Sequence, residues 1–193
     1  VGEVETSDVL STVNIPFVDW NEDSGLIVTD GAVLWTNPEN GPAGSILIAS
    51  LTTPSCGSAL SATVNAQGSS TSGADWRQLG ITFSWTPTCP PVVADTIVVD
   101  TVTPSVDEVE TSPLGTTVKL YLDLGAEQAN LYSIYASSET PAMVFPPAYN
   151  PDPSNIGVGI LEQDSYLTVG EVETSDVLST VNIPFGDWND DSG

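Results

Sequence analysis

An internal repeat constrains this chain more than any other feature. Residues 1–25 read VGEVETSDVLSTVNIPFVDWNEDSG, and residues 169–193 read VGEVETSDVLSTVNIPFGDWNDDSG. The copies agree at 23 of 25 positions, with Val169 as the counterpart of Val1, and differ only at Val18/Gly186 and Glu22/Asp190. Self-similarity at a fixed period is the signature of repeat architectures. The sequence therefore predicts a tandem array, of which these 193 residues cover one period and the start of the next.

The short-range pattern is one of strands separated by turns. Residues 58–67 and 78–85 alternate apolar with polar side chains, as strands with one buried face do. Dipeptides such as Asp30-Gly31 and Asn40-Gly41 favour turns between the strands, and no segment shows a sustained helical period. The expected fold class is all-β, an antiparallel β-sandwich of the immunoglobulin or jelly-roll kind. Further strands are expected at residues 9–17, 26–29, 32–36, 46–52, 96–102, 116–124, 131–136 and 166–169.

The charge balance excludes two classes of partner. Asp and Glu total 26, whereas Lys119 and Arg77 are the only basic residues, which gives a formal net charge of −24. Nucleic acid is excluded because almost nothing can neutralise its phosphates. Binding to an anionic membrane is disfavoured for the same reason, and no apolar run is long enough to predict membrane insertion.

The two cysteines, Cys56 and Cys89, bracket the strands expected at 58–67 and 78–85. If these strands form a hairpin, its open end brings the two sulfur atoms near bonding distance. We therefore expect a disulfide and an oxidising compartment, the alternative being two buried thiols.

One acidic turn has the spacing of a calcium loop. Asp19, Asn21 and Asp23 place oxygen atoms at alternate positions, and Asp187, Asn189 and Asp191 repeat the pattern. Alternate oxygen ligands in a tight loop suit Ca²⁺. The alternative is an acidic turn anchored by a tryptophan, without any metal.

The residues of most catalytic sites are missing. The sequence contains no histidine, no Gly-rich phosphate loop and no Gly-x-Ser-x-Gly motif. Carboxylates such as Glu162 and Asp164 have no context that distinguishes them as a glycosidase pair. We expect a protein that is not an enzyme and has no cofactor other than calcium.

Several strings together resemble a known kind of repeat module. They are LYSIY (131–135), MVFPPA (143–148), DSYLTVG (164–170), LIVTDGAVLW (26–35) and ATVNAQG (62–68). In this cyclic order they are similar to a tandem β-repeat module, without an assigned activity, of large secreted proteins in aquatic microbial eukaryotes and bacteria. The resemblance implies that residues 1–88 end one module and that 105–193 begin the next module. The prolines at 87, 90 and 91 favour a stiff linker or connecting strand, which we expect at 89–104. A closed sandwich formed by residues 1–100 alone would contradict this division.

These observations favour a structural repeat unit of an extracellular filament or surface fibre. Its partners are then copies of itself, joined end to end or by shared strands, with O-glycans on the Ser/Thr-rich stretches as a further expectation. Compactness predicts an axial repeat of about 40–60 Å. The alternative is a Ca²⁺-dependent adhesin or a carbohydrate-binding array, in which five tryptophans would serve as stacking platforms. They are Trp20, Trp35, Trp76, Trp85 and Trp188.

Overall fold

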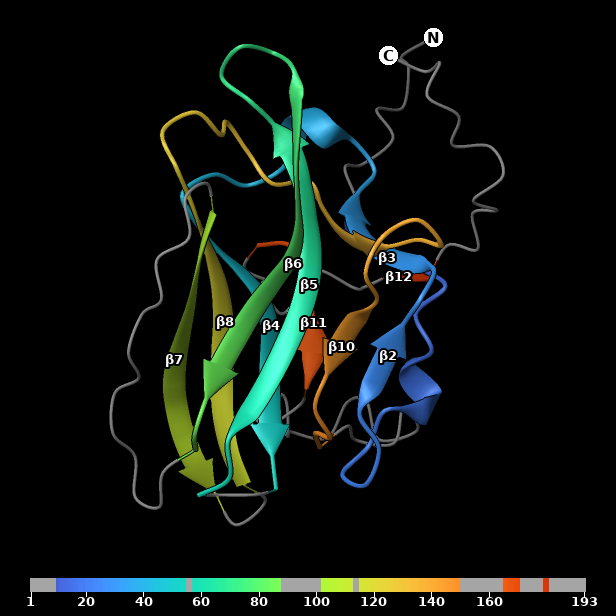
Figure 1. Cartoon of the computed structure of the whole chain (residues 1–193), viewed down its shortest axis with the longest axis vertical. Helices are drawn as coiled ribbons and strands as arrows, with labels where there is room; N and C mark the ends of the chain where they lie inside the picture. Colours follow the sequence, from blue (N-terminus) through green and yellow to red (C-terminus); the bar gives the residue numbers. More distant parts are fainter. Residues whose placement is uncertain are drawn as a thin grey trace, which may run out of the picture.

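The fold is all-β, built from two sheets whose strands pair mostly antiparallel (Figure 1). The computed structural model describes residues 10–54, 57–87, 102–112, 115–149, 165–170 and 179–180. Within these ranges there is no α-helix, and the only helical turns are two short 3-10 segments, η1 (Phe17–Asp19) and η2 (Pro38–Asn40). None of the described helical segments has the length and hydropathy that crossing a bilayer requires.

The larger sheet has eight strands in the order β12-β1-β3-β9-β5-β10-β2, with β6 also paired to β5. The β5–β6 hairpin is the one that the alternating pattern predicts, and its register runs from Leu60 opposite Trp85 to Ser69 opposite Asp75. The strands are β1 (Leu10–Val13), β2 (Leu26–Val28), β3 (Gly31–Trp35), β5 (Leu60–Ser69), β6 (Asp75–Trp85), β9 (Ser133–Ala136), β10 (Met143–Phe145) and β12 (Ser179–Thr180).

The smaller sheet has four strands in the order β11-β4-β8-β7. They are β4 (Ser45–Thr53), β7 (Val102–Ser112), β8 (Gly115–Leu124) and β11 (Tyr166–Leu167). The strand expected at residues 96–102 lies outside the described residues except for its last position, where β7 begins.

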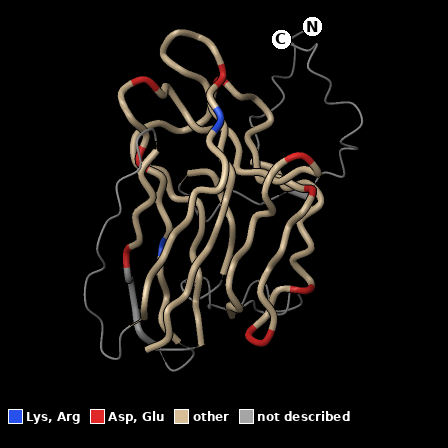
Figure 2. Tube along the Cα trace, viewed as in Figure 1, with Lys and Arg blue, Asp and Glu red and all other residues tan. Residues whose placement is uncertain are grey.

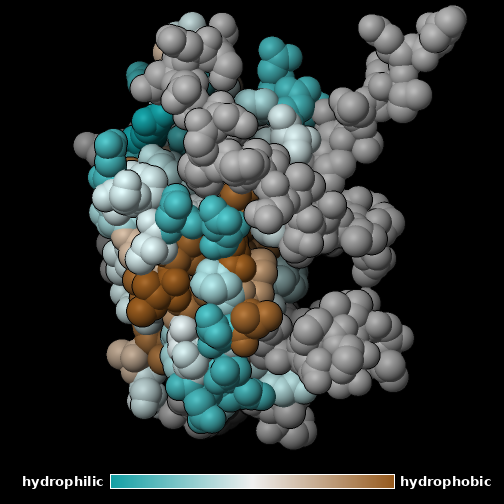
Figure 3. All heavy atoms as spheres, turned by 90° about the vertical axis from the view of Figure 1, so that its right-hand side faces the viewer, coloured by the Kyte–Doolittle hydropathy of each residue, from teal (hydrophilic) through white to brown (hydrophobic). Residues whose placement is uncertain are grey.

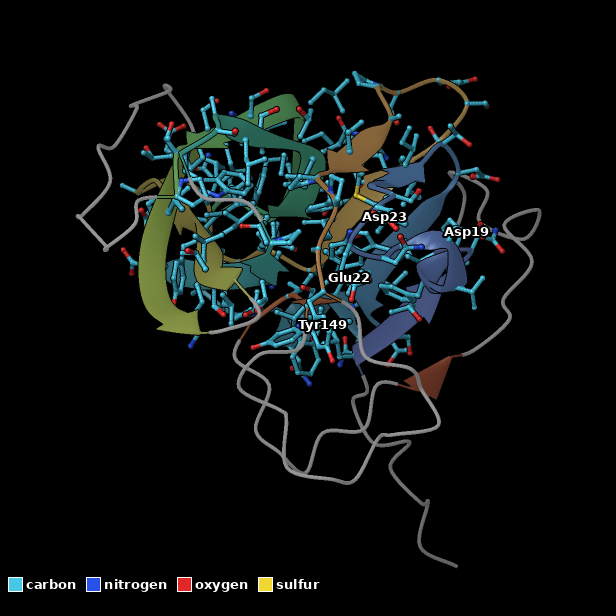
Figure 4. The ribbon with its side chains drawn as sticks, turned by 90° about the horizontal axis from the view of Figure 1, so that it is seen from below. Asp19, Glu22, Asp23 and Tyr149 are labelled. Carbon is cyan, nitrogen blue, oxygen red and sulfur yellow. The ribbon has the colours of Figure 1, made fainter. Side chains whose placement is uncertain are left out.

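The main apolar core draws on both sheets. Val64 and Ile134 of the larger sheet and Ile48 and Leu120 of the smaller sheet belong to one cluster, and each is fully buried. Seen from below, side chains of both sheets fill the space between them (Figure 4). Burial of each such aliphatic side chain contributes about 1.5–3 kcal/mol, which makes this cluster the main source of stability.

Strands from the two ends of the chain interleave in both sheets. In the smaller sheet β4 pairs with β8 and β11. In the larger sheet β9 lies between β3 and β5. The described residues within 10–87 and those within 102–170 thus share their sheets. Which period supplies each portion in a longer array stays a prediction.

Candidate functional site

The second repeat copy begins inside the fold. Its first residue, Val169, is fully buried, and its carbonyl oxygen accepts a 2.8 Å hydrogen bond from the indole N–H of Trp35. The backbone N–H of Gly170 donates to the carbonyl oxygen of Leu47 at 2.8 Å. Gly170 has φ +102° and lies against Pro42, a conformation that favours glycine. The start of the second copy is therefore part of this fold.

The first repeat copy reaches the same place. Its strand β1 pairs antiparallel with β3, with Leu10 opposite Trp35 and Val13 opposite Ala32. The backbone of Trp35 thus lies beside the first copy, while its half-buried side chain holds the second. We name the set Leu10, Trp35, Val169 and Gly170 the repeat junction.

A second contact between the copies lies on the other edge of β1. There β12 pairs in parallel, with Ser11 opposite Ser179 and Thr12 opposite Thr180. The predictions from sequence did not include this pairing or the Trp35–Val169 contact. The one available signal was that the strand-forming segment Leu-Ser-Thr-Val occurs in both copies.

The acidic turn is closed by Asn21 itself. Its side-chain oxygen accepts hydrogen bonds from the backbone N–H groups of Asp23 and Ser24, both at 3.0 Å. Its backbone oxygen accepts from the N–H of Ala148 at 3.1 Å, which ties the turn to the segment before Tyr149. The side-chain oxygen of Asn21, which would coordinate Ca²⁺, therefore already accepts two hydrogen bonds within the turn.

The carboxylates of this turn do not converge. Asp19, Glu22 and Asp23 are exposed, and Figure 4 shows their carboxylates apart from one another. No group of three His, Cys, Asp or Glu side chains placed to hold a metal occurs within the described part of the chain. The repeated set Asp187, Asn189 and Asp191 lies outside the described residues, so calcium at either copy stays a proposal.

A buried tryptophan, Trp20, anchors the turn to the apolar core. Trp20 is 1% exposed, its indole N–H donates to the carbonyl oxygen of Pro146 at 2.9 Å, and its ring lies 5.9 Å from that of Phe145. Trp76 and Trp85 are also buried. Trp188 lies outside the described residues. The described tryptophans are thus used mainly in packing.

Cys56 and Cys89 lie outside the described residues, but their neighbours show where the hairpin ends. Beyond the pair Leu60–Trp85, the N–H of Gly57 donates to the carbonyl oxygen of Pro87 at 2.6 Å. Gly57, which follows Cys56 in the sequence, and Pro87, two positions before Cys89, therefore lie together at the open end of β5–β6. The disulfide itself stays a prediction.

Two tyrosines lie near one of the two basic residues. The pKa of Tyr132 is raised to about 12, first by burial and then by the nearby charge of Asp75 and a hydrogen bond to it, while Arg77 opposes the shift. Burial also raises the pKa of Tyr135, again opposed by Arg77. Both phenols therefore keep their protons at neutral pH and are unsuited to act as bases.

The surface carries its charges mostly on the loops and an apolar patch on one side. Figure 2 shows most described carboxylates near the ends of strands. On the outer face of the larger sheet, Ile27 of β2 lies opposite Val144 of β10, and they are 61% and 39% exposed. Figure 3 shows apolar surface on this side of the molecule.

Comparison with known proteins gives no relative to reason from. No family model, no curated protein and no solved structure matches the chain.

Proposed function

We propose that this chain is a non-catalytic structural unit of an extracellular filament or surface fibre, built from β-sandwich modules that repeat at the spacing between Val1 and Val169. The double role of Trp35 supports this most directly. Its backbone pairs with Leu10 of the first copy, and its indole holds Val169 of the second. Both ends of the module thus meet at one residue.

The length of the link between modules favours a continuous fibre. Leu178 is the repeat counterpart of Leu10, and eight residue steps (178 − 170) separate it from Gly170. Eight steps span at most about 26–29 Å. A compact module of this length has a diameter of roughly 40 Å. In the proposed array, successive repeat junctions therefore lie less than one module diameter apart. The modules cannot all be centred on the line through these junctions, so they must lie beside this line, on alternating sides or around it.

Composition supports a location outside the cell. With Lys119 and Arg77 as the only basic residues, trypsin-like proteases have only two candidate sites. The hydrogen bond between Gly57 and Pro87 supports a disulfide between Cys56 and Cys89, which would suit an oxidising compartment. The absence of histidine from the sequence argues against most catalytic sites. The expected partners are other copies of this module.

Electron microscopy of the native, undigested material tests the proposal. We expect fibres wider than one module, with a rise per module below the roughly 40 Å module diameter, because the short link limits the rise. This expected rise is lower than the range of about 40–60 Å that compactness alone predicts. Dispersed chains of beads, each separated from the next by a flexible gap, would overturn the filament and favour the Ca²⁺-dependent adhesin.

A further inference from the structure

The strand β1 has two edges, and the repeat copies meet on the outer one. Its inner edge is filled by β3 through four register pairs, from Leu10–Trp35 to Val13–Ala32. Its outer edge holds β12, in which Ser179 lies opposite Ser11 and Thr180 opposite Thr12. The differences 179 − 11 and 180 − 12 both equal the repeat offset, 169 − 1. Each residue therefore lies beside its own counterpart in the other copy.

This pairing differs from every other one among the described strands. The others are antiparallel and join segments of different sequence. Identical segments that stack parallel and in register place like residues side by side, an arrangement in which one sequence serves as both template and partner. The unpaired N–H and C=O groups of an edge strand are a ready template for such an addition.

We propose that the outer edge of β1 is a self-recognition edge, which takes the same strand of the next repeat copy along the chain in parallel and in register. The inference rests on the proposed filament, because the second copy of the strand comes from the next module of the array. The occupant is the next copy because Val169 and Gly170 fix the start of that copy at the repeat junction, where β1 also begins. Eight further residue steps lead from Gly170 to Leu178, and this length of chain is sufficient to reach the outer edge of β1.

One edge can take only one strand, and this limits the assembly. When β1 of one module pairs with β1 of the next, the outer edges of both strands are used. A third module finds no free edge there. The contact therefore joins modules in pairs, so the structure of the fibre repeats every two modules. The covalent chain connects each pair to the next.

Paired cysteines in the full chain test both the contact and its register. Register partners on neighbouring strands lie about 4.8 Å apart, within the range for a disulfide, whereas positions shifted by one residue point to opposite faces. Under mild oxidation, the variant Ser11→Cys/Ser179→Cys should form a link within one chain. Its linked fraction should exceed that of the shifted control Ser11→Cys/Thr180→Cys by about tenfold. Peptide mapping separates this link from any involving Cys56 and Cys89.

Equal linking in both variants, or none in either, would overturn the register pairing. A link between position 11 of one molecule and position 179 of another would overturn the assignment of the occupant to the same chain. A disulfide link without fibres in the microscope would support the self-recognition edge and contradict the filament. Fibres without the link would support the filament and contradict the self-recognition edge.

A proline variant gives a readout that does not depend on cysteine. Thr180→Pro removes a backbone donor from β12 and should speed hydrogen exchange at residues 10–13 and at Ser179 by about tenfold. Gly186→Pro is the control, because it adds a proline to the same copy beyond β12. Equal effects of the two variants on residues 10–13, or no effect of either, would overturn the proposal.

Discussion

The indole N–H of Trp35 donates a 2.8 Å hydrogen bond to the carbonyl oxygen of Val169, 134 residues further along the chain. Val169 is fully buried, so water cannot replace a lost donor at its carbonyl. The bond ties the first residue of the second repeat copy to the strand that pairs with the first copy. This side chain thus links the two copies at the repeat junction.

Trp35→Phe should lower the free energy of unfolding by about 1–3 kcal/mol, because it leaves a buried acceptor without this donor. Urea denaturation followed by fluorescence measures the loss. Hydrogen exchange should also accelerate at residues 165–170 before global unfolding. Trp20→Phe is the matched control, since it removes an indole hydrogen bond to Pro146 away from the junction. Similar acceleration at 165–170 in both variants would contradict the role of Trp35.

A disulfide between Cys56 and Cys89 should appear as an intact mass two hydrogens below that of the reduced chain. It would close the loop from Cys56 to Cys89 across the open end of the β5–β6 hairpin. The chain-entropy relation gives about 3–4 kcal/mol for a loop of about 33 residues. Cys56→Ser and Cys89→Ser should each lower the free energy of unfolding by that amount under non-reducing conditions and leave stability under reducing conditions nearly unchanged. Free thiols in the native protein would exclude the bond.

The strands were the most predictable part of the fold. Alternating side chains identified the β5–β6 hairpin, because a strand with one buried face repeats every two residues. Most of β4 and β8 was also predicted, although residues 46–53 of β4 are buried throughout and do not alternate. The short strand β10 was not predicted. Its three residues, Met143–Phe145, show too little alternation, and its position depends partly on Asn65, whose buried amide donates to the carbonyl oxygen of Pro141 at 2.7 Å. Such a contact depends on tertiary structure and leaves no local pattern.

The candidate site was less predictable than the strands. The spacing of Asp19, Asn21 and Asp23 does not reveal that the Asn21 oxygen caps its own turn. Nor does a strand that occurs twice in the sequence indicate which copy pairs with β3 and which lies outside. Local preferences are the same for both copies, so only the path of the chain distinguishes them.

Added salt should stabilise the chain by screening, and calcium should add no specific effect at the acidic turn. The net charge of −24 produces self-repulsion that cations weaken. Because the carboxylates of Asp19 and Asp23 lie apart and Asn21 is engaged, CaCl₂ and MgCl₂ at equal ionic strength should raise the Tm equally. Asp19→Asn/Asp23→Asn should respond to both salts as the parent chain does. A larger rise with calcium, lost in this variant, would instead establish the calcium site.

Alkaline pH should destabilise the fold through Tyr132, whose pKa rises from an ordinary 10.0 to about 12 on folding. Below pH 10 the phenol is protonated in both states and adds no slope. Between about pH 10 and 12 the unfolded chain releases this proton while the folded chain keeps it. The unfolded state then binds fewer protons, so stability falls as pH rises.

Urea denaturation at about pH 9 and pH 11 measures this slope. Tyr132→Phe should lower stability at about pH 9 by about 0.5–1.5 kcal/mol, because its hydrogen bond to Asp75 is lost, and by less at about pH 11, where the parent chain has itself lost part of the stability that Tyr132 provides. It should also reduce the difference between the two pH values. Tyr135→Phe added to it should flatten the slope further, because burial raises that pKa too. Tyr149→Phe, in another part of the fold, is the matched control. An unchanged slope in Tyr132→Phe would show that other groups cause the alkaline loss.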